Sequence, residues 1–495
     1  MCLGTMATMN TSKPIKFGTD GWRAVIADDF TYEAVRAVSQ GIAAYVAGDT
    51  RPVVVGHDAR FSAELFAKEV CRVLAANGIH VILCDSVAPT PVITWTVVDR
   101  KAVGGVVVTA SHNPAEFNGI KYKPDYGGSA SQEVVDAIEI EVERAQRDGI
   151  KEMSFAEALE KGLVEKYDPY PAYEAQVARR VDLAALRNAG LHVLHDPMYG
   201  AGCGYLTRLL AGGSTTVHEV HGERNPGFAG LHPEPIAQYL PETMATMRKG
   251  GYDLAIANDG DADRIGVVDE TGRFLNQLQM AALYTMYLLE QQKEMGPVVR
   301  SLTSTSMLDE LGKQFNVPVI ETKVGFKFIG PEMMQQDAII GCEESGGFAF
   351  RGHIPERDGI LAALYAMDMI MKYGKPLSAI LAQLEERVGP HAYTRRDVRF
   401  PRDGYEAQKK RVYSLLQEQP PTEVGGTKIT STRTDDGAKL YLADGSWVLV
   451  RMSGTEPLMR IYSEAPTLGR AQELVDQLAS WVESRGIALP AMAEA

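Results

Sequence analysis

Residues 106–114, VVVTASHNP, combine the pattern of a buried strand with side chains that could take part in catalysis. A β-branched run predicts a strand, and its polar end would lie where an α/β sheet presents its ligand-binding loops. The hydroxyl of Ser111 stands beside the imidazole of His112, and the amine of Lys121 follows further along the chain. Pro114 has no N–H and predicts a sharp turn directly after these residues. Taken alone, the segment fits a catalytic loop and an ordinary strand-to-turn connection about equally well.

Three carboxylates alternate along residues 259–264, DGDADR, directly after an apolar run. Asp259, Asp261 and Asp263 could converge on one hard cation through their oxygens, with Gly260 allowing a tight backbone. The segment lacks the glycine and the distal glutamate of an EF-hand loop, and so few ligands favour Mg²⁺. A solvated acidic turn is the other interpretation. Because crowded carboxylates repel one another without a cation, the pattern favours the metal site.

A phosphate site is indicated by residues 451–457, RMSGTEP, and by Arg460 beyond them. Ser453, Gly454 and Thr455 would form a tight turn with hydroxyl and backbone N–H donors, while Arg451 and Arg460 supply guanidinium groups. This combination suits a phosphate dianion. The alternative is a capped turn before a strand, with both arginines at the surface.

Two further segments carry weaker signals. Residues 343–347, EESGG, place Glu343 and Ser345 where they could hydrogen-bond sugar hydroxyls, although an exposed acidic turn explains them equally well. Residues 17–23, FGTDGWR, form a glycine-rich stretch from which Arg23 could reach an anion.

The composition narrows the class of ligand. The 495 residues carry a formal net charge of −14, which argues against nucleic-acid or anionic-membrane partners but leaves a small anionic substrate open. The five cysteines show no zinc spacing and suit a reducing cytoplasm, so we expect a cytoplasmic protein. No apolar run approaches the ~20 residues that span a bilayer.

These candidate loops follow predicted strands that alternate with amphipathic helices, a pattern typical of parallel α/β units. The predicted strands are 52–56, 103–108, 191–195, 253–257, 298–302 and 338–342, with helices at 62–77, 131–148 and 280–295. The C-terminal region instead predicts a partly antiparallel α+β domain, with strands at 427–432, 438–442 and 447–451 and a helix at 469–485.

We expect a disordered leader at 1–15 and four domains, in the order of the candidate loops. Their expected bounds are 16–165 (domain I, serine loop), 166–275 (domain II, acidic loop), 276–390 (domain III, EESGG loop) and 391–495 (domain IV, RMSGTEP loop).

The chain resembles the α-D-phosphohexomutase family of phosphoglucomutases and phosphomannomutases, whose motifs occur here in the same order as FGTDGWR, TASHNP, DGDADR, EESGG and RMSGTEP. The resemblance covers nearly the whole chain, from about Lys16 to about Arg485. It implies a heart-shaped α/β fold, with three related α/β domains and a C-terminal α+β domain around one central cleft.

The resemblance also implies roles for individual residues. Ser111 would be the phosphoserine and contribute to the Mg²⁺ site with Asp259, Asp261 and Asp263. Arg23 and Lys121 would lie near the reacting phosphoryl group, with Lys121 either a base or a phosphate contact and His112 either a base or a residue that orders the loop. The implied substrate-binding residues are Glu343, Ser345, Lys327, Arg451, Ser453, Gly454, Thr455 and Arg460.

The implied activity is that of an isomerase that interconverts α-D-glucose 1-phosphate and glucose 6-phosphate through a phosphoserine, with Mg²⁺ as cofactor and glucose 1,6-bisphosphate as activator and intermediate. The subgroup that prefers N-acetylglucosamine phosphates and the bifunctional phosphomannomutases commonly carry His where this chain has Gly347. EESGG followed by residues 353–359, HIPERDG, is more similar to prokaryotic phosphoglucomutases. A bifunctional phosphomannomutase/phosphoglucomutase and a phosphotransferase that forms hexose 1,6-bisphosphate are the alternatives. No protein partner is implied.

Overall fold

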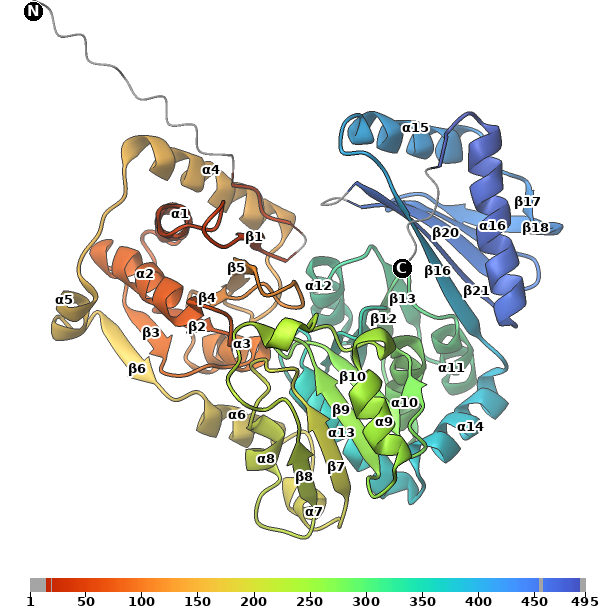
Figure 1. Ribbon diagram of the computed structural model, residues 1–495, viewed down its shortest axis with the longest axis horizontal. Helices are drawn as coiled ribbons and strands as arrows, with labels where there is room; N and C mark the ends of the chain where they lie inside the picture. Colours follow the sequence, from red (N-terminus) through yellow and green to blue (C-terminus); the bar gives the residue numbers. More distant parts are fainter. Residues whose placement is uncertain (1–14, 19, 454–456, 490–495) are drawn as a thin grey trace, which may run out of the picture.

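The computed structural model describes residues 15–18, 20–453 and 457–489, so nearly all of the expected leader at 1–15 lies outside it. Four β-sheets follow one another along the chain, and the helices pack against them (Figure 1). We number the domains I to IV by these sheets. Among the described residues, no helix is both long and apolar enough to cross a membrane.

Domain I is a mixed sheet between two layers of helices, in the strand order β1-β5-β4-β2-β3-β6. The alternation of buried valines explains the layers: Val53 and Val55 pack with α1, α2 and α4, whereas Val54 and Val107 point to the opposite face. Its strands are β1 (Trp22–Val25), β2 (Val53–His57), β3 (Val81–Cys84), β4 (Gly104–Val108), β5 (Phe117–Pro124) and β6 (Val164–Tyr167). Its helices are α1 (Tyr32–Tyr45), α2 (Ala63–Ala76), α3 (Thr90–Asp99), α4 (Gln132–Asp148) and α5 (Phe155–Glu160).

Domain II has the strand order β11-β10-β9-β7-β8, and its acidic loop joins the antiparallel strands β9 and β10. Asn258 pairs with Ile265, so the acidic residues lie in the hairpin loop 259–264. The strands are β7 (His192–Asp196), β8 (Thr216–Glu219), β9 (Leu254–Asn258), β10 (Ile265–Asp269) and β11 (Phe274–Leu275). The helices are α6 (Tyr170–Val177), α7 (Leu183–Arg187), α8 (Tyr205–Leu209), η1 (Phe228–Gly230), η2 (Ala237–Tyr239) and α9 (Pro241–Arg248).

Domain III has the strand order β13-β12-β14-β15, and the EESGG loop turns between β14 and β15. The helix predicted at 280–295 runs instead from Gln277 to Glu290, because Asn276 and Gln279 form a capping box that starts it earlier. The strands are β12 (Val298–Ser301), β13 (Val319–Thr322), β14 (Ile340–Cys342) and β15 (Phe348–Phe350). The helices are α10 (Gln277–Glu290), α11 (Met307–Phe315), α12 (Phe326–Gln336), α13 (Gly359–Tyr373) and α14 (Leu377–Val388).

Domain IV is a fully antiparallel sheet, where the sequence predicted a partly antiparallel one. One face packs on α15 and α16, and the other contacts Leu302 and Val324 of domain III through Trp447 and Tyr462. The strands are β16 (Ala392–Arg399), β17 (Glu423–Val424), β18 (Thr427–Arg433), β19 (Ala438–Leu442), β20 (Trp447–Met452) and β21 (Leu458–Ala465). The helices are α15 (Tyr405–Glu418) and α16 (Leu468–Ser484).

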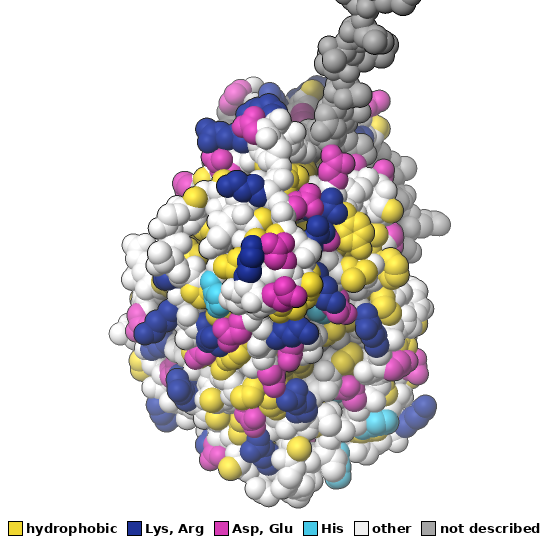
Figure 2. Space-filling model, turned by 90° about the vertical axis from the view of Figure 1, so that its left-hand side faces the viewer, with side chains coloured by type: hydrophobic (Ala, Val, Ile, Leu, Met, Phe, Trp, Pro, Cys, Tyr) yellow, Lys and Arg dark blue, Asp and Glu magenta, His cyan; other side chains and the backbone are white. Residues whose placement is uncertain are grey.

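The domain bounds expected from the sequence remain proposals, and we adjust one of them. β6 pairs with β3 and continues to Tyr167, so we place the end of domain I after this residue rather than at 165. Over the face on the domain I side, basic and acidic side chains are intermixed (Figure 2), so no region of one charge dominates that face.

Domains I and III are joined by an ion-pair network that is nearly closed to solvent. Lys123 and Glu356 have fully buried side chains, and their charged atoms lie 2.7 Å apart. Asp20 accepts from Lys123 at 3.0 Å and from Arg357 at 2.6 Å. Although burial acts in the opposite direction, Lys123 and Arg357 lower the pKa of Glu356 to about 2. A carboxylate this well paired tolerates burial that would otherwise be costly.

We predict that Glu356→Gln lowers the free energy of unfolding by about 3–5 kcal/mol at neutral pH, because it leaves a buried lysine charge partly uncompensated. The stabilisation from Glu356 is present above its ordinary pKa of 4.5 and disappears as the pH falls toward about 2. The variant should therefore lose less stability than the wild type on acidification. Thermal denaturation at a series of pH values checks this. The control Glu157→Gln breaks an exposed pair with Lys161 and should change little. Equal effects of the two substitutions would contradict the proposed network.

Candidate active site

Ser111 lies directly after β4, at the contact between domains I and II. Its side chain is fully buried, and its backbone adopts a left-handed conformation with φ of 53°. The Oγ atom donates to Asp259 Oδ2 at 2.9 Å, and the backbone N–H donates to Thr109 Oγ1 at 2.8 Å. The serine hydroxyl therefore faces the acidic loop of the neighbouring domain.

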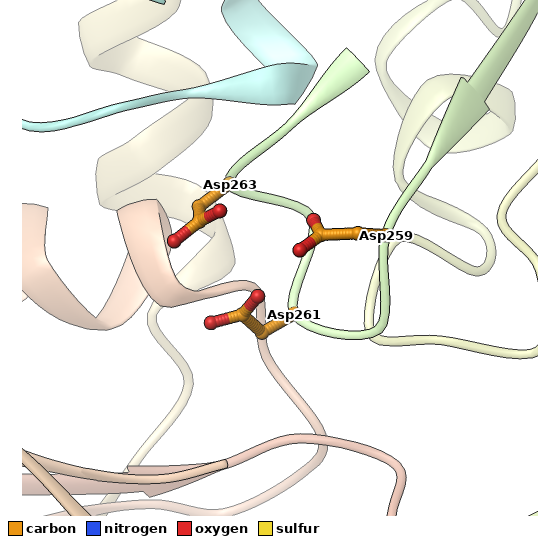
Figure 3. A group of neighbouring side chains, drawn as sticks. All are labelled: Asp259, Asp261 and Asp263. Carbon is orange, nitrogen blue, oxygen red and sulfur yellow. The ribbon is translucent and has the colours of Figure 1, made fainter. Parts of the chain in front are cut away.

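The three aspartates converge as the sequence predicted. Asp259, Asp261 and Asp263 are fully buried, and one carboxylate oxygen from each lies within 4.8 Å of the others (Figure 3). Burial and the other two carboxylates raise the pKa of Asp259 well above its ordinary value. This electrostatic conflict is what a divalent cation between the carboxylates would relieve.

The donor set fits Mg²⁺. Asp261 Oδ1 and Asp263 Oδ1 are buried and have no hydrogen-bond partner. Unpartnered buried oxygens are uncommon in folded proteins, and hard carboxylate oxygens are the ligands that Mg²⁺ prefers. Asp259 supplies a third oxygen, and Ser111 would add a fourth beside it.

Lys121 lies in the middle of this acidic group. Its Nζ contacts Asp261 Oδ2 at 2.8 Å, Asp20 Oδ2 at 2.9 Å and Asp263 Oδ2 at 3.1 Å. Burial lowers the pKa of Lys121, but these three carboxylates outweigh that effect and raise it above its ordinary value. A general base would need the opposite shift, so this arrangement favours a lysine that keeps its proton.

Arg23 and His112 lie on the domain I side of the site. Arg23 extends from β1, and its Nη1 donates to Asn113 Oδ1 at 2.7 Å, next to the serine. The Nδ1 atom of His112 lies 3.5 Å from Ser111 Oγ. Burial and the positive charges of Arg264 and Arg23 lower the pKa of His112 well below its ordinary value. These surroundings favour the neutral imidazole and disfavour its protonated form.

The EESGG loop contacts the acidic hairpin through backbone bonds. Ile265 N donates to Gly346 O at 3.1 Å, which fixes Glu343 and Ser345 close to the metal loop. Burial raises the pKa of Glu343, whose Oε2 is 3.9 Å from Arg357 Nη1. A Cβ on Gly347 would lie only 2.3 Å from Arg357 Cδ, so no larger residue fits there without moving that arginine.

Glu344 points away from this loop toward domain IV. It accepts hydrogen bonds from Tyr393 Oη at 3.1 Å and from Arg395 Nη1 at 3.3 Å, both on β16. This contact, between the second residue of the EESGG loop and the first strand of domain IV, was not predicted from the sequence.

The predicted phosphate site is described in part. Arg451 and Arg460 are opposite partners on β20 and β21, so their side chains emerge on one face of the sheet. Ser453 lies at the end of β20, whereas Gly454 and Thr455 lie outside the described residues. Lys327 lies in the first turn of α12. Burial lowers the pKa of its amine, and the positive charge of Arg451 also acts to lower it.

Three charged residues at the site were missed by sequence reasoning: Asp20, Arg264 and Arg357. Asp20 and Arg264 are part of the FGTDGWR and DGDADR segments, where their positions next to the chosen residues were the available signal. Arg357 pairs with Asp263 at 3.1 Å and with Asp20, joining three domains at one guanidinium. Its signal was the segment 353–359, HIPERDG, which belongs to the resemblance to prokaryotic phosphoglucomutases, although no role was predicted for the arginine itself.

Comparisons with known proteins match this architecture along the chain. Models of phosphoglucomutase/phosphomannomutase alpha/beta/alpha domains I, II and III match residues 14–148, 171–272 and 276–388, and a model of the C-terminal domain matches 405–480. The chain is 32% identical to a phosphoglucomutase/phosphomannomutase from Thermococcus kodakarensis, over 93% of this chain and 96% of the relative.

Two further proteins show the spread of descriptions among its relatives. A phosphoglucosamine/phosphogalactosamine mutase from Sulfurisphaera tokodaii is 29% identical, over 95% of this chain and 99% of the relative. A crystal structure of a Thermus thermophilus protein, provisionally described as a phosphomannomutase, aligns with a TM-score of 0.82 and 33% identity, over 95% of this chain and 100% of that chain.

We predict that Mg²⁺ raises the melting temperature of the wild type and that Asp259→Asn abolishes this rise. At 100 times the dissociation constant, binding adds about 2.7 kcal/mol to the stability. Without metal, the variant should be at least as stable as the wild type, because it removes one of three mutually repelling buried charges. Thermal melts with Mg²⁺ and with EDTA check both parts, with Asp476→Asn on the surface of α16 as the control. A full Mg²⁺ response in Asp259→Asn would exclude this site.

Proposed function

Because the chain belongs to the phosphoglucomutase/phosphomannomutase family of isomerases, we propose that it interconverts α-D-glucose 1-phosphate and glucose 6-phosphate. The observation that carries this proposal is the buried hydroxyl of Ser111, which faces three converging aspartates across a domain contact. A serine in this position can carry a phosphoryl group, and the basic residues around it can neutralise the charge of that group.

In this proposal the resting enzyme carries phosphate on Ser111, and Asp259, Asp261 and Asp263 hold Mg²⁺. The ion would supply positive charge to the phosphoserine and to the charge that develops during transfer. Lys121 and Arg23 stabilise the same charge from the domain I side. Phosphoryl transfer depends mostly on such positioning and charge neutralisation, which a buried, preorganised site provides.

The transfer also requires movement of one proton. As the sugar hydroxyl oxygen bonds to phosphorus, the bond from phosphorus to Ser111 Oγ breaks and the hydroxyl loses its proton. We propose His112 as the proton acceptor on geometry, because its Nδ1 lies 3.5 Å from Ser111 Oγ, whereas the carboxylates around Lys121 raise the pKa of that amine. Burial lowers the pKa of His112 and makes it a weak base, so ordering of the serine loop is its alternative role. The serine oxygen regains a phosphoryl group when the glucose 1,6-bisphosphate intermediate returns its other phosphate.

The substrate must bind in two orientations, with either phosphate at the distal end. Glu343 and Ser345 would hold the sugar hydroxyls, while Arg451, Arg460 and Ser453 would bind the distal phosphate, together with Gly454 and Thr455. Lys327, near Arg451, would help to sense the orientation of the sugar. Guanidinium and hydroxyl donors recognise the phosphate dianion and not the shape of the sugar, which suits both orientations.

Glucose is favoured over other hexoses by Gly347, where mannose- and N-acetylglucosamine-using subgroups commonly have His. Relatives at similar identity include proteins described as acting on mannose and on amino-sugar phosphates. A bifunctional phosphomannomutase/phosphoglucomutase and a phosphotransferase forming hexose 1,6-bisphosphate are therefore the alternatives. We also propose a cytoplasmic location, from the cysteine content of the chain.

The test is a side-by-side assay of glucose, mannose and N-acetylglucosamine 1-phosphates, with Mg²⁺ and a trace of glucose 1,6-bisphosphate. We expect the highest kcat/KM for glucose 1-phosphate, and at least a thousandfold loss of kcat in Ser111→Ala because the phosphoryl carrier is gone. Comparable turnover of mannose 1-phosphate would make the enzyme bifunctional, and net accumulation of bisphosphate would favour the phosphotransferase. Activity that survives in Ser111→Ala would overturn the proposed mechanism.

A further inference from the structure

Arg60 is a fully buried arginine that the mechanism above does not use. It follows β2 in domain I, and its side chain has no exposed surface. Isolated guanidinium groups are rarely buried because desolvation of a charge is expensive. A buried arginine is therefore expected to have its N–H donors paired with acceptors inside the protein.

The guanidinium of Arg60 binds the backbone of the serine loop. Nη2 donates to Ser111 O at 2.6 Å and to Asn113 O at 2.5 Å. Nη1 donates to Pro114 O at 2.8 Å and to Phe117 O at 3.0 Å. Three carbonyl oxygens of the loop that carries the candidate phosphoserine, and a fourth at the start of β5, thus converge on one planar group. Nε lies 3.2 Å from Asp58 Oδ2, which balances the charge.

Asp58 extends the contact to the other side of the loop. Thr109 Oγ1 donates to Asp58 Oδ2 at 2.6 Å, and the same hydroxyl accepts from Ser111 N at 2.8 Å. Ser111 is therefore held at its carbonyl by Arg60 and at its N–H by Thr109, and both of these residues contact Asp58. A left-handed backbone at a non-glycine residue costs free energy, and this double contact opposes its relaxation.

The serine carbonyl also meets the acidic loop of domain II. A Cβ on Gly260 would lie 2.4 Å from Ser111 O, so the two loops are in close backbone contact at this atom. The position of the Ser111 carbonyl therefore affects how its Oγ approaches Asp259. We propose that Arg60, supported by Asp58 and Thr109, is a positioning residue that holds the Ser111 hydroxyl in line with the three aspartates.

Lysine could keep the charge of Arg60 but not its function. A single ammonium cannot span four carbonyl oxygens with the fixed fork of a guanidinium. Since a displacement of about 1 Å can cost about a hundredfold in rate, Arg60→Lys should lower kcat about a hundredfold. KM should change less than about threefold, because the sugar and distal phosphate contacts come from domains III and IV.

The experiment uses the full chain and compares Arg60→Lys with the matched control Arg187→Lys. Arg187 also binds a backbone carbonyl and a carboxylate, but in domain II, away from Ser111. We would measure kcat and KM for glucose 1-phosphate, the melting temperature, and the rate at which glucose 1,6-bisphosphate phosphorylates Ser111, followed by intact mass. We expect slow phosphorylation and low kcat only in Arg60→Lys. A purely structural role would lower the melting temperature while the folded fraction kept its kcat, and this outcome would overturn the inference.

If Arg60→Lys does not fold, the pair Thr109→Val and Thr109→Ser tests the same arrangement. Valine removes the hydroxyl at nearly constant volume, whereas serine keeps it, so serine should recover most of the kcat that valine loses. Equal kcat in the two variants would count against the inference. The kinetic measurement rests on the proposed function, but a failure of that function can be distinguished from a failure of the role assigned to Arg60. A wild type without phosphoserine or turnover refutes the function, and an active wild type with an equally active Arg60→Lys refutes only the role of Arg60.

Discussion

The arrangement of the site depends on buried charges that belong to three domains. Lys121 and Lys123 come from one strand of domain I, Asp261 and Asp263 from the hairpin of domain II, and Arg357 with its neighbour Glu356 from domain III. Each of these charges would be costly to bury alone, so the domains cannot separate or slide without exposing an uncompensated group. The ion pairs that surround the candidate active site thus also fix the spacing of the domains.

Much of the fold could be predicted because its strands are short, apolar and separated by distinctive loops. The runs at 103–108 and 253–257 became β4 and β9, and each carries its candidate loop at its C-terminal end. Asp259, Asp261 and Asp263 could be grouped for the simple reason that alternate residues of a hairpin turn stay close in space. A short sequence pattern was therefore sufficient to predict a group of side chains when all of its members lie within one loop.

Contacts between distant segments could not be predicted in this way. Asp20, Lys123 and Arg357 are ordinary charged residues in the sequence, and only the packing of domains I and III reveals them as one network. The same holds for Arg60. Its proposed role depends on backbone carbonyl groups more than 50 residues away, and the pattern of side chains in the sequence does not predict contacts with backbone groups. The direction of the pKa shift at Lys121 likewise depends on carboxylates from outside its own strand.

Gly347 has a consequence for how this chain could diverge. Any side chain at this position would meet Arg357, whose guanidinium is already engaged with Asp20, Asp263 and Glu356. A histidine there would require the Arg357 side chain to shift, and that shift would disturb its contacts with Asp20 and Asp263. A substitution at position 347 would therefore act on the domain contacts through Arg357. The space available at position 347 of the EESGG loop is thereby coupled to the packing of three domains.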